Sequence, residues 1–238
     1  MALLFCTFSL QAEDNNVLQI RTIAIPPYGI VSESRLSGIY YDIANTLASE
    51  AGFNISHQIY PYSRIIRELK SGHTDLTIMF KYKELKDYVT YIAPLPGLKN
   101  VVIGIAGSSF SDVASLKGKK LGYLRGAKFS DLIDNDPDII KVETIDFSQG
   151  IKMLDARRID AVIGPFDPIL MAAKSLGYSP LFFGKPLVVS KRTPWVQISK
   201  KSESRVSVED LKSHFLELLK RGDLERLRKK YISSSTSK

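Results

Sequence analysis

The sequence has very little cysteine and histidine, and it has no long apolar run. Cys6 is the only cysteine among 238 residues, so the chain cannot form an internal disulfide. The three histidines, His57, His73 and His214, lie far apart with no HxxxH or CxxC partner, which argues against a zinc site built by local spacing. No apolar run reaches the roughly 18–20 residues that predict a membrane-spanning helix.

Motifs of the common enzyme classes are also missing. The chain has no GxxxxGKS or GxxxxGKT phosphate-binding loop, no GxGxxG dinucleotide turn and no GxSxG nucleophile turn. Nothing in the sequence indicates a cofactor. A catalytic site assembled from distant residues would leave no such motif, so these absences weaken an enzymatic interpretation without ending it.

The composition is that of a globular chain with a substantial core, because 44% of the residues are hydrophobic and 24% are charged. The net charge is +8. The basic clusters at residues 117–120, 200–205 and 220–230 are spread along the chain, whereas a nucleic-acid reader gathers basic and aromatic residues on one face. We therefore expect no nucleic-acid partner, and the positive charge favours an anionic small ligand.

The two ends of the chain differ from the rest. Residues 1–12, MALLFCTFSLQA, carry no charge and run from apolar to small and polar residues, so they resemble the remnant of a secretory signal peptide. A buried N-terminal strand is the alternative interpretation. Residues 233–238 are rich in serine and are predicted to form a disordered tail.

The first part of the chain alternates strand and helix patterns. Strands are predicted over residues 18–25, 54–60 and 75–80, and helices over residues 41–51 and 63–72, with Ser63 as a helix cap. Strand 54–60 alternates Ile55, His57 and Ile59 with polar neighbours. This β-α-β-α-β order predicts a parallel sheet with crossover helices.

A second series of the same kind follows the Pro-rich segment at residues 94–97. Strands are predicted over residues 100–105, 119–124, 141–145, 160–164 and 195–199. Between them come helical patterns at 129–133, at 148–157 with Ser148 as cap, and at 167–177 with Asp167 as cap. Two C-terminal helices follow, and the first starts at Ser207, with Asp210 three residues later. The chain therefore predicts an α/β fold with two units joined near residues 94–100.

Several short motifs coincide in order and spacing with one family. They are Pro26-Pro27-Tyr28 after the first strand, GIYYDI at 38–43, RIIRELKSG at 64–72 ahead of Asp75, LKGKKLG at 116–122 followed by Gly126-Ala127, and LDARRIDAVI at 154–163. Together they resemble the bacterial extracellular solute-binding proteins of family 3, the periplasmic polar amino-acid type. The resemblance spans residues 18–232.

This resemblance implies a type II periplasmic-binding-protein fold. Residues 17–98 would form the first part of lobe 1, residues 99–188 lobe 2, and residues 189–232 the return to lobe 1 with its C-terminal helices. The lobes would be joined by two hinge segments and would close on a small ligand without a chemical step. It further implies a periplasmic monomer whose partner is a membrane permease complex or a membrane receptor.

Open α/β sheets bind ligands at the carboxyl ends of their strands, and this rule predicts which residues line the cleft. Lobe 1 would contribute Tyr28, Tyr62, Arg64, Phe80, Lys81 and Tyr82, and lobe 2 would contribute Arg125, Gly126, Ala127, Lys128, Phe129, Phe166 and Asp167. Residues 126–129 are expected to open a helix whose free N–H groups could hold an anion. For Lys81, Arg125 and Lys128 the alternative is a surface position, and for Asp167 it is a helix cap.

Two departures from the family pattern bear on the ligand. Leu85 stands where the family places the arginine that binds an amino acid's carboxylate, and Pro165 stands where it places the aspartate that binds the ammonium group. An unpaired buried carboxylate is strongly unfavourable, so these departures argue against an ordinary amino acid. We expect a small polar or anionic ligand, with Arg64 as a replacement cation.

Two other functions stay open on the same scaffold. One is a dehydratase resembling cyclohexadienyl dehydratase, for which Glu84 and Asp167 are the nearby acid or base candidates. The other is an orphan sensory module that reads a ligand without a transporter.

Overall fold

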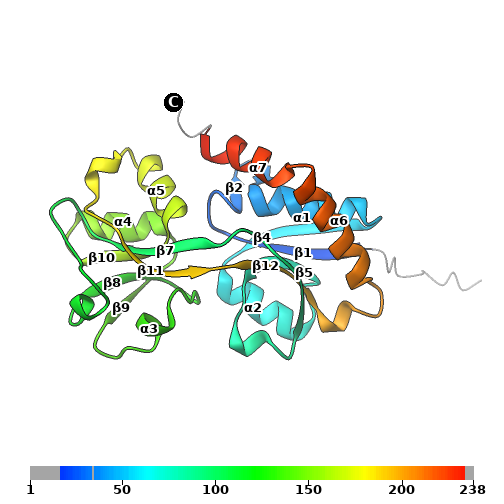
Figure 1. The fold of residues 1–238 in the computed structure, drawn as a ribbon, viewed down its shortest axis with the longest axis horizontal. Helices are drawn as coiled ribbons and strands as arrows, with labels where there is room; N and C mark the ends of the chain where they lie inside the picture. The colour runs from blue at the N-terminus through cyan, green and yellow to red at the C-terminus, as the bar shows by residue number, and fades with distance from the viewer. Residues whose placement is uncertain (1–16, 34, 234–238) are drawn as a thin grey trace, which may run out of the picture.

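The computed structural model describes residues 17–33 and 35–233, and it has two lobes, each built on a five-stranded sheet (Figure 1). The strand orders are β4-β1-β5-β12-β6 and β11-β7-β10-β8-β9, and a small hairpin, β2-β3, lies apart. The predicted α/β fold with two lobes is thus confirmed. The predictions for residues 1–12 and for the tail beyond residue 233 lie outside the described residues.

Lobe 1 contains the first sheet and the helices that cover it. Its strands are β1 (Val17–Ile23), β4 (Asn54–Tyr60), β5 (Leu76–Phe80), β6 (Val89–Pro94) and β12 (Pro194–Ser199), and its helices are α1 (Ile39–Glu50), α2 (Tyr62–Ser71), α6 (Val208–Lys220) and α7 (Asp223–Arg228). Strands β4, β1 and β5 are parallel, as the β-α-β-α-β order predicts. Strand β12, supplied by a later part of the chain, lies antiparallel between β5 and β6.

Lobe 2 contains the second sheet. Its strands are β7 (Leu98–Ile103), β8 (Lys120–Leu124), β9 (Ile140–Thr144), β10 (Ala161–Pro165) and β11 (Leu187–Arg192), and its helices are α3 (Asp131–Asp134), α4 (Phe147–Asp155) and α5 (Phe166–Ser175). The hairpin strands are β2 (Ile30–Ser32) and β3 (Arg35–Ser37), and single short turns of helix lie at Lys83–Leu85, Ala114–Leu116, Pro180–Phe182, Lys200–Ser202 and Lys229–Ser233.

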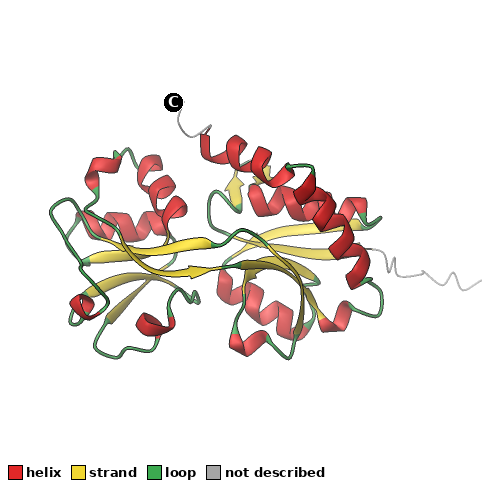
Figure 2. Cartoon of the chain, in the orientation of Figure 1, coloured by secondary structure: helices red, strands yellow, loops and turns green. Residues whose placement is uncertain are grey.

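Within the described residues, the chain passes between the two sheets at two places. The first lies between β6 and β7, and the second between β11 and β12, where Thr193 alone separates the two strands. Figure 2 shows these strands running through the middle of the molecule from one lobe to the other. Two short connections therefore carry the whole covalent link between the lobes.

Three of the predicted helix caps are wrong, and the structure shows why. Helix α2 begins at Tyr62 because Pro61 is held extended just before it, so Ser63 lies inside the helix. Helix α4 is capped by Asp146, whose carboxylate accepts the Gln149 N–H at 2.7 Å, rather than by Ser148.

Helix α5 begins at Phe166, so Asp167 lies in its first turn and makes no capping hydrogen bond. The predicted helix start at Ser207 is confirmed, and the Ser207 hydroxyl caps α6 by accepting the Asp210 N–H at 3.2 Å.

A buried carboxylate ties the C-terminal part of lobe 1 to its first strand. Asp75 is 1% exposed and accepts hydrogen bonds from the Gln19 N–H at 2.7 Å, from the Arg205 guanidinium at 2.6 Å and from the Ser202 hydroxyl. Gln19 belongs to β1, whereas Ser202 and Arg205 follow β12. This contact therefore fixes the returning chain to lobe 1.

We predict that Asp75→Ala lowers the free energy of unfolding by about 3 kcal/mol, because it removes the carboxylate partner of Arg205 and the acceptor of the Gln19 N–H from a buried position. Equilibrium denaturation in urea measures the effect, with the exposed Asp87 replaced by alanine as the control. Equal losses in the two variants would contradict this role for Asp75.

His57 of β4 is buried in lobe 1. Its ring lies 4.0 Å from that of Tyr41, its Nε2 is 2.9 Å from the Thr22 hydroxyl and its Nδ1 is 2.7 Å from the Asn45 side-chain oxygen. Burial, with a smaller contribution from the charge of Arg21, lowers the pKa of His57 from 6.5 to about 3. The imidazole is therefore neutral in the folded protein.

This lowered pKa makes stability depend on pH. Below pH 6.5 the unfolded chain binds a proton at His57 that the folded chain does not bind until about pH 3, so folding stability falls as pH falls between these values. The expected loss from this group is roughly 2–3 kcal/mol between pH 7.5 and 4.5. His57→Gln should reduce this loss, whereas a change of the exposed His73 to Gln should not. Urea midpoints at the two pH values provide the measurement, and identical pH dependence in all three proteins would refute the assignment.

Candidate ligand cleft between the lobes

Within the described residues, three cavities lie side by side between the lobes and share the side chain of Ile25, which follows β1. The central cavity has a volume of about 10 Å³, and those on either side have volumes of about 300 and about 140 Å³. The central cavity is lined by Ile23, Ile25, Tyr28, Tyr40, Tyr62, Met79, Phe80, Leu98, Pro165 and Pro194. The lobes therefore touch at the centre of the cleft and leave open space on both sides.

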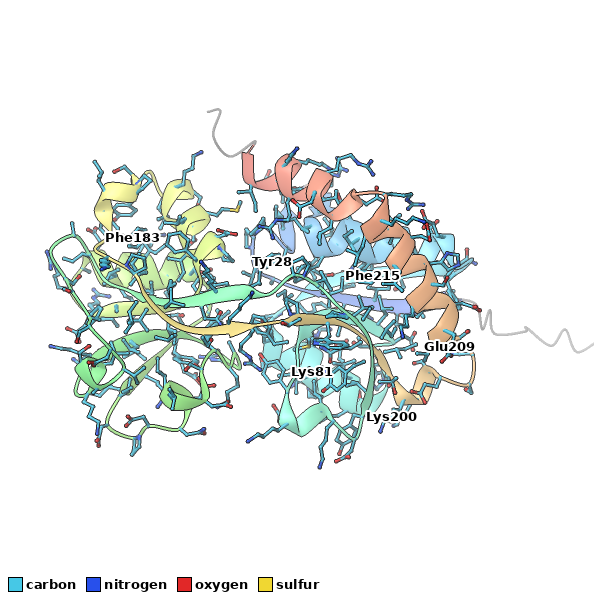
Figure 3. The ribbon with its side chains drawn as sticks, viewed as in Figure 1. Tyr28, Lys81, Phe183, Lys200, Glu209 and Phe215 are labelled. Atoms are coloured by element: carbon cyan, nitrogen blue, oxygen red, sulfur yellow. The ribbon has the colours of Figure 1, made fainter. Side chains whose placement is uncertain are left out.

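Tyrosines of lobe 1 form one wall of the cleft. Tyr28 follows Pro27 and stacks on Tyr40, with ring centroids 4.3 Å apart and an angle of 16° between the rings. Tyr62 opens α2 and lies 6.1 Å from the ring of Tyr82. Figure 3 labels Tyr28 where the lobes meet.

The side chains of Tyr28, Tyr62 and Tyr82 are at most 5% exposed, and burial raises the pKa of each phenol above 10. These hydroxyls stay protonated and can donate hydrogen bonds.

Two predicted cations of lobe 1 are engaged elsewhere. The Arg64 guanidinium forms an ion pair with Glu68 at 2.8 Å and covers the ring of Tyr60 at 3.4 Å. The Lys81 ammonium lies 3.6 Å from the centre of the Trp195 ring. The structure does not bring either charge to the lining of the interlobe cavities described above.

The loop after β8 forms part of the opposite wall. Arg125 lines the 140 Å³ cavity and pairs with Glu143 at 2.9 Å. Gly126 has a φ of +75°, and a Cβ atom there would lie 3.2 Å from Ser63 of lobe 1, so the two lobes approach closely at this point. Ala127 is 4% exposed, and the side chain of Lys128 is exposed.

The expected helical anion site at residues 126–129 is wrong. Helix α3 begins only at Asp131, and Phe129 is fully buried at 0% exposure in lobe 2. The N–H groups of Phe129 and Ser130 both point to the Asp134 carboxylate at 3.4 Å, so they are not free to hold an anion. Phe129 packs 5.3 Å from Tyr123 and belongs to the core rather than to the cleft.

The start of α5 meets lobe 1 from the other side. Phe166 is half-buried, and the Asp167 carboxylate lies 4.0 Å from the Arg228 guanidinium of α7. Both charges act on the phenol of Tyr28, whose pKa is raised first by burial and then by Asp167 and is lowered by Arg228. This ion pair therefore bridges the lobes beside the tyrosine wall.

Arg192, which no motif or predicted strand end marks in the sequence, also bridges the lobes. Its guanidinium donates hydrogen bonds to the carbonyl oxygen of Lys81 at 2.6 Å and to that of Lys128. It lies 4.9 Å from the ring centre of Phe80 and 5.7 Å from that of Tyr82. Arg192 ends β11 at the second crossing. The nearest signal in the sequence is the predicted strand at residues 195–199, which corresponds to β12.

Neither a metal-ligand cluster nor a membrane-spanning helix is found in residues 17–33 and 35–233. These residues contain no group of three or more His, Cys, Asp or Glu side chains placed to hold a metal ion. In the same part of the chain, no helix has the length and apolarity needed to cross a bilayer.

The close approach of Ser63 and Gly126 predicts a disulfide when both are replaced by cysteine in a Cys6→Ser background, because their Cβ atoms fall near disulfide distance. A pair made from Ser63→Cys and Gly118→Cys is the control, since Gly118 also has a positive φ but nothing within 4 Å of its Cβ position. Only the first pair should cross-link in air, as measured by mobility on a non-reducing gel. A folded first variant that keeps both thiols free would contradict the contact.

Comparison with known proteins supports the resemblance drawn from the motifs. Residues 19–119 match the family model of bacterial extracellular solute-binding proteins, family 3. No curated protein matches the chain.

Solved structures match along nearly the whole chain. A mutant of ArgBP from T. maritima is 21% identical, with a TM-score of 0.77 and coverage of 92% of this chain and 96% of that one. An ABC uptake transporter substrate-binding protein from Streptococcus pneumoniae with bound histidine is 17% identical, with a TM-score of 0.78 and coverage of 92% and 93%. The GluR0 ligand-binding core with L-glutamate is 15% identical, with a TM-score of 0.74 and coverage of 90% and 98%.

The predicted resemblance is therefore confirmed: the chain matches the family-3 extracellular solute-binding proteins over residues 19–119, and it has the two-lobed type II periplasmic-binding-protein fold.

Proposed function

We propose that this protein is a solute-binding protein that captures a small polar or anionic ligand between its lobes and releases it unchanged. One observation carries the proposal. Residues of both lobes line the cavities between them, and within the described residues the two sheets are joined only by two short crossings. The proposed lobe boundaries are residues 17–98, 99–188 and 189–232. The chain changes sheet after Pro94 and after Arg192. The boundary at residue 98 therefore falls at the first residue of β7, and the boundary at residue 189 falls inside β11, whose residues belong to the sheet of lobe 2.

Closure would be driven by contacts that the ligand makes only when both lobes reach it. A ligand shifts an open–closed equilibrium by no more than its difference in affinity for the two states, so both walls must contribute. Tyr28 and Tyr62 supply the wall of lobe 1, and Pro165 and Arg125 supply that of lobe 2. Because the central cavity is only about 10 Å³, a ligand would have to separate the lobes before they close around it.

The ligands of the structural neighbours define the first class to test. Arginine, histidine and glutamate are bound in solved structures with this fold. They support a small ligand of about amino-acid size that carries a carboxylate. Leu85 is fully buried and Pro165 ends β10, so neither place that the family pattern uses for an amino acid's charged groups offers a charge. This chain would therefore hold its ligand through other residues.

The proposed partner is the permease complex of an ABC-type uptake system, and the proposed location is the periplasm, where such a protein would act as a monomer. The description of the matched family as extracellular solute-binding proteins supports the location, and structural neighbours described as substrate-binding proteins of ABC transporters support the partner. A membrane receptor that reads the closed form is the alternative partner.

A chemical step has no observation in its favour. Of the two acid or base candidates, Glu84 pairs with Lys70 at 3.0 Å and its side chain is 52% exposed. The other, Asp167, pairs with Arg228 at 4.0 Å.

A thermal-shift screen of amino acids, small peptides, organic acids and aromatic anions tests the proposal. A compound that binds only the folded state at 100 times its Kd stabilises it by about 2.7 kcal/mol, so at least one compound should raise the melting temperature by several degrees. The compound should be recovered intact after incubation. Turnover of prephenate, arogenate or any other binding compound, or a screen without a single hit, would contradict the proposal.

A further inference from the structure

We infer that the cleft selects a flat, apolar-bodied monoanion of the arylcarboxylate class, whose ring lies against the tyrosine wall and whose carboxylate is met by Arg192. This inference rests on the proposed solute-binding function and names the ligand class of the same cleft. It excludes zwitterionic amino acids as the preferred ligands.

The lining of the central cavity favours an apolar, flat body. All ten residues that line it are uncharged, and the tyrosine hydroxyls are its polar side-chain groups. The stacked pair Tyr28 and Tyr40 shows that this wall packs rings face to face. Tyr62 and Phe80 extend the aromatic surface around the same cavity. Aromatic faces of this kind bind planar ligands through dispersion and offset stacking.

The cavities offer no free carboxylate for an ammonium group. Among the described residues that line the three interlobe cavities, Asp146 is the one acidic side chain, and it caps α4 through the Gln149 N–H. Asp167, at the edge of the cleft, already faces the Arg228 guanidinium. An ammonium group closed in this cleft would lose its water without gaining a partner, which strongly disfavours binding.

Arg192 carries a positive charge that no described carboxylate neutralises. Arg192 is half-buried, and within the described residues it donates hydrogen bonds to the main-chain carbonyls of Lys81 and Lys128. Arg21 and Arg205 also donate to main-chain carbonyls, but each adds a carboxylate partner, Glu68 at 3.1 Å and Asp75 at 2.6 Å. Arg192 does not itself line the three interlobe cavities, but its guanidinium lies 4.9 Å from the ring centre of Phe80, which lines the central one. Neutral carbonyls orient a guanidinium but leave its charge uncompensated, so an anion would bind there favourably.

A buried phenol next to Arg192 strengthens the case for an anion. Tyr82 is 5% exposed, and its hydroxyl proton has no acceptor among the described residues, although the main chain of Lys128 lies beside its oxygen. The Arg192 guanidinium lies 5.7 Å from the centre of this ring, and Tyr62 lies 6.1 Å from it on the cleft side. A buried donor left unpaired is unfavourable unless a ligand accepts its hydrogen bond. A carboxylate can accept from the guanidinium and from this hydroxyl together.

Three matched probes separate charge from shape. L-phenylalanine, 3-phenylpropionate and 3-phenylpropionamide share one ring and one chain, and they present a zwitterion, a monoanion and a neutral group. Isothermal titration calorimetry should show 3-phenylpropionate binding at least about tenfold more tightly than either of the others, the factor expected for one charge-assisted hydrogen bond.

Variants then test the role of Arg192. Arg192→Gln should weaken 3-phenylpropionate at least about tenfold and should abolish its advantage over the amide, a change that a merely structural role would not cause. Lys191→Gln, which removes an exposed cation one residue away on the same strand, should leave both affinities unchanged. If Arg192→Gln does not fold, Tyr82→Phe removes only the hydroxyl and should weaken the acid more than the amide.

The outcomes separate this inference from the proposed function. Tighter binding of L-phenylalanine or of another zwitterion than of its desamino acid would overturn the ligand class while leaving solute binding intact. Equal affinity for acid and amide, or an unchanged preference for the acid in Arg192→Gln, would overturn the role of Arg192. If none of the probes and no compound of the wider screen binds, both the inference and the proposed function fail.

Discussion

The arrangement of the molecule depends on the small number of connections between its two sheets. Within the described residues, the chain crosses only after Pro94 and after Arg192, and the second crossing leaves a single residue between two strands. Such connections hold the lobes together but do not fix the angle between them. That angle is set by noncovalent contacts across the cleft, namely the bridge of Arg192 to both lobes, the ion pair between Asp167 and Arg228, and the close approach of Ser63 to Gly126. A ligand would act on these same contacts.

Each lobe, in contrast, is held internally by buried and specific interactions. In lobe 1, Asp75 ties the returning chain to β1, and Gln197 of β12 donates to the carbonyl of Met79 at 2.7 Å. In lobe 2, Asn100 and Ser190 both donate to the carbonyl of Phe129, which fixes the loop after β8 to the two strands that lead into the crossings. Each lobe is therefore held by buried hydrogen bonds, whereas few contacts join the lobes across the cleft. This difference is what allows one lobe to move as a unit against the other.

Much of the fold follows from local patterns, whereas the charges of the cleft do not. Strict alternation over residues 54–60 predicts β4 with its bounds, whereas β11 mixes half-buried and exposed residues without a regular alternation. The strand-end rule leads to Tyr28, Tyr62 and Phe80, which line the central cavity.

The same rule leads to Arg64 and Phe129, which the structure places with Glu68 and in the core of lobe 2. Arg192 ends β11, so the rule would have led to it, but β11 itself is not predicted from the sequence. Its partners, Lys81 and Lys128, are 111 and 64 residues away in sequence, so no local pattern connects the three residues.

The lobes are expected to move as units about the two crossings. This movement is tested most directly by the distance between spin labels placed at the exposed Asp87 and Asp131, one on each lobe, in a Cys6→Ser background. Pulsed electron resonance should show a broad distance distribution that collapses to one short distance when a binding compound is added. A single narrow distance that no compound changes would contradict the account.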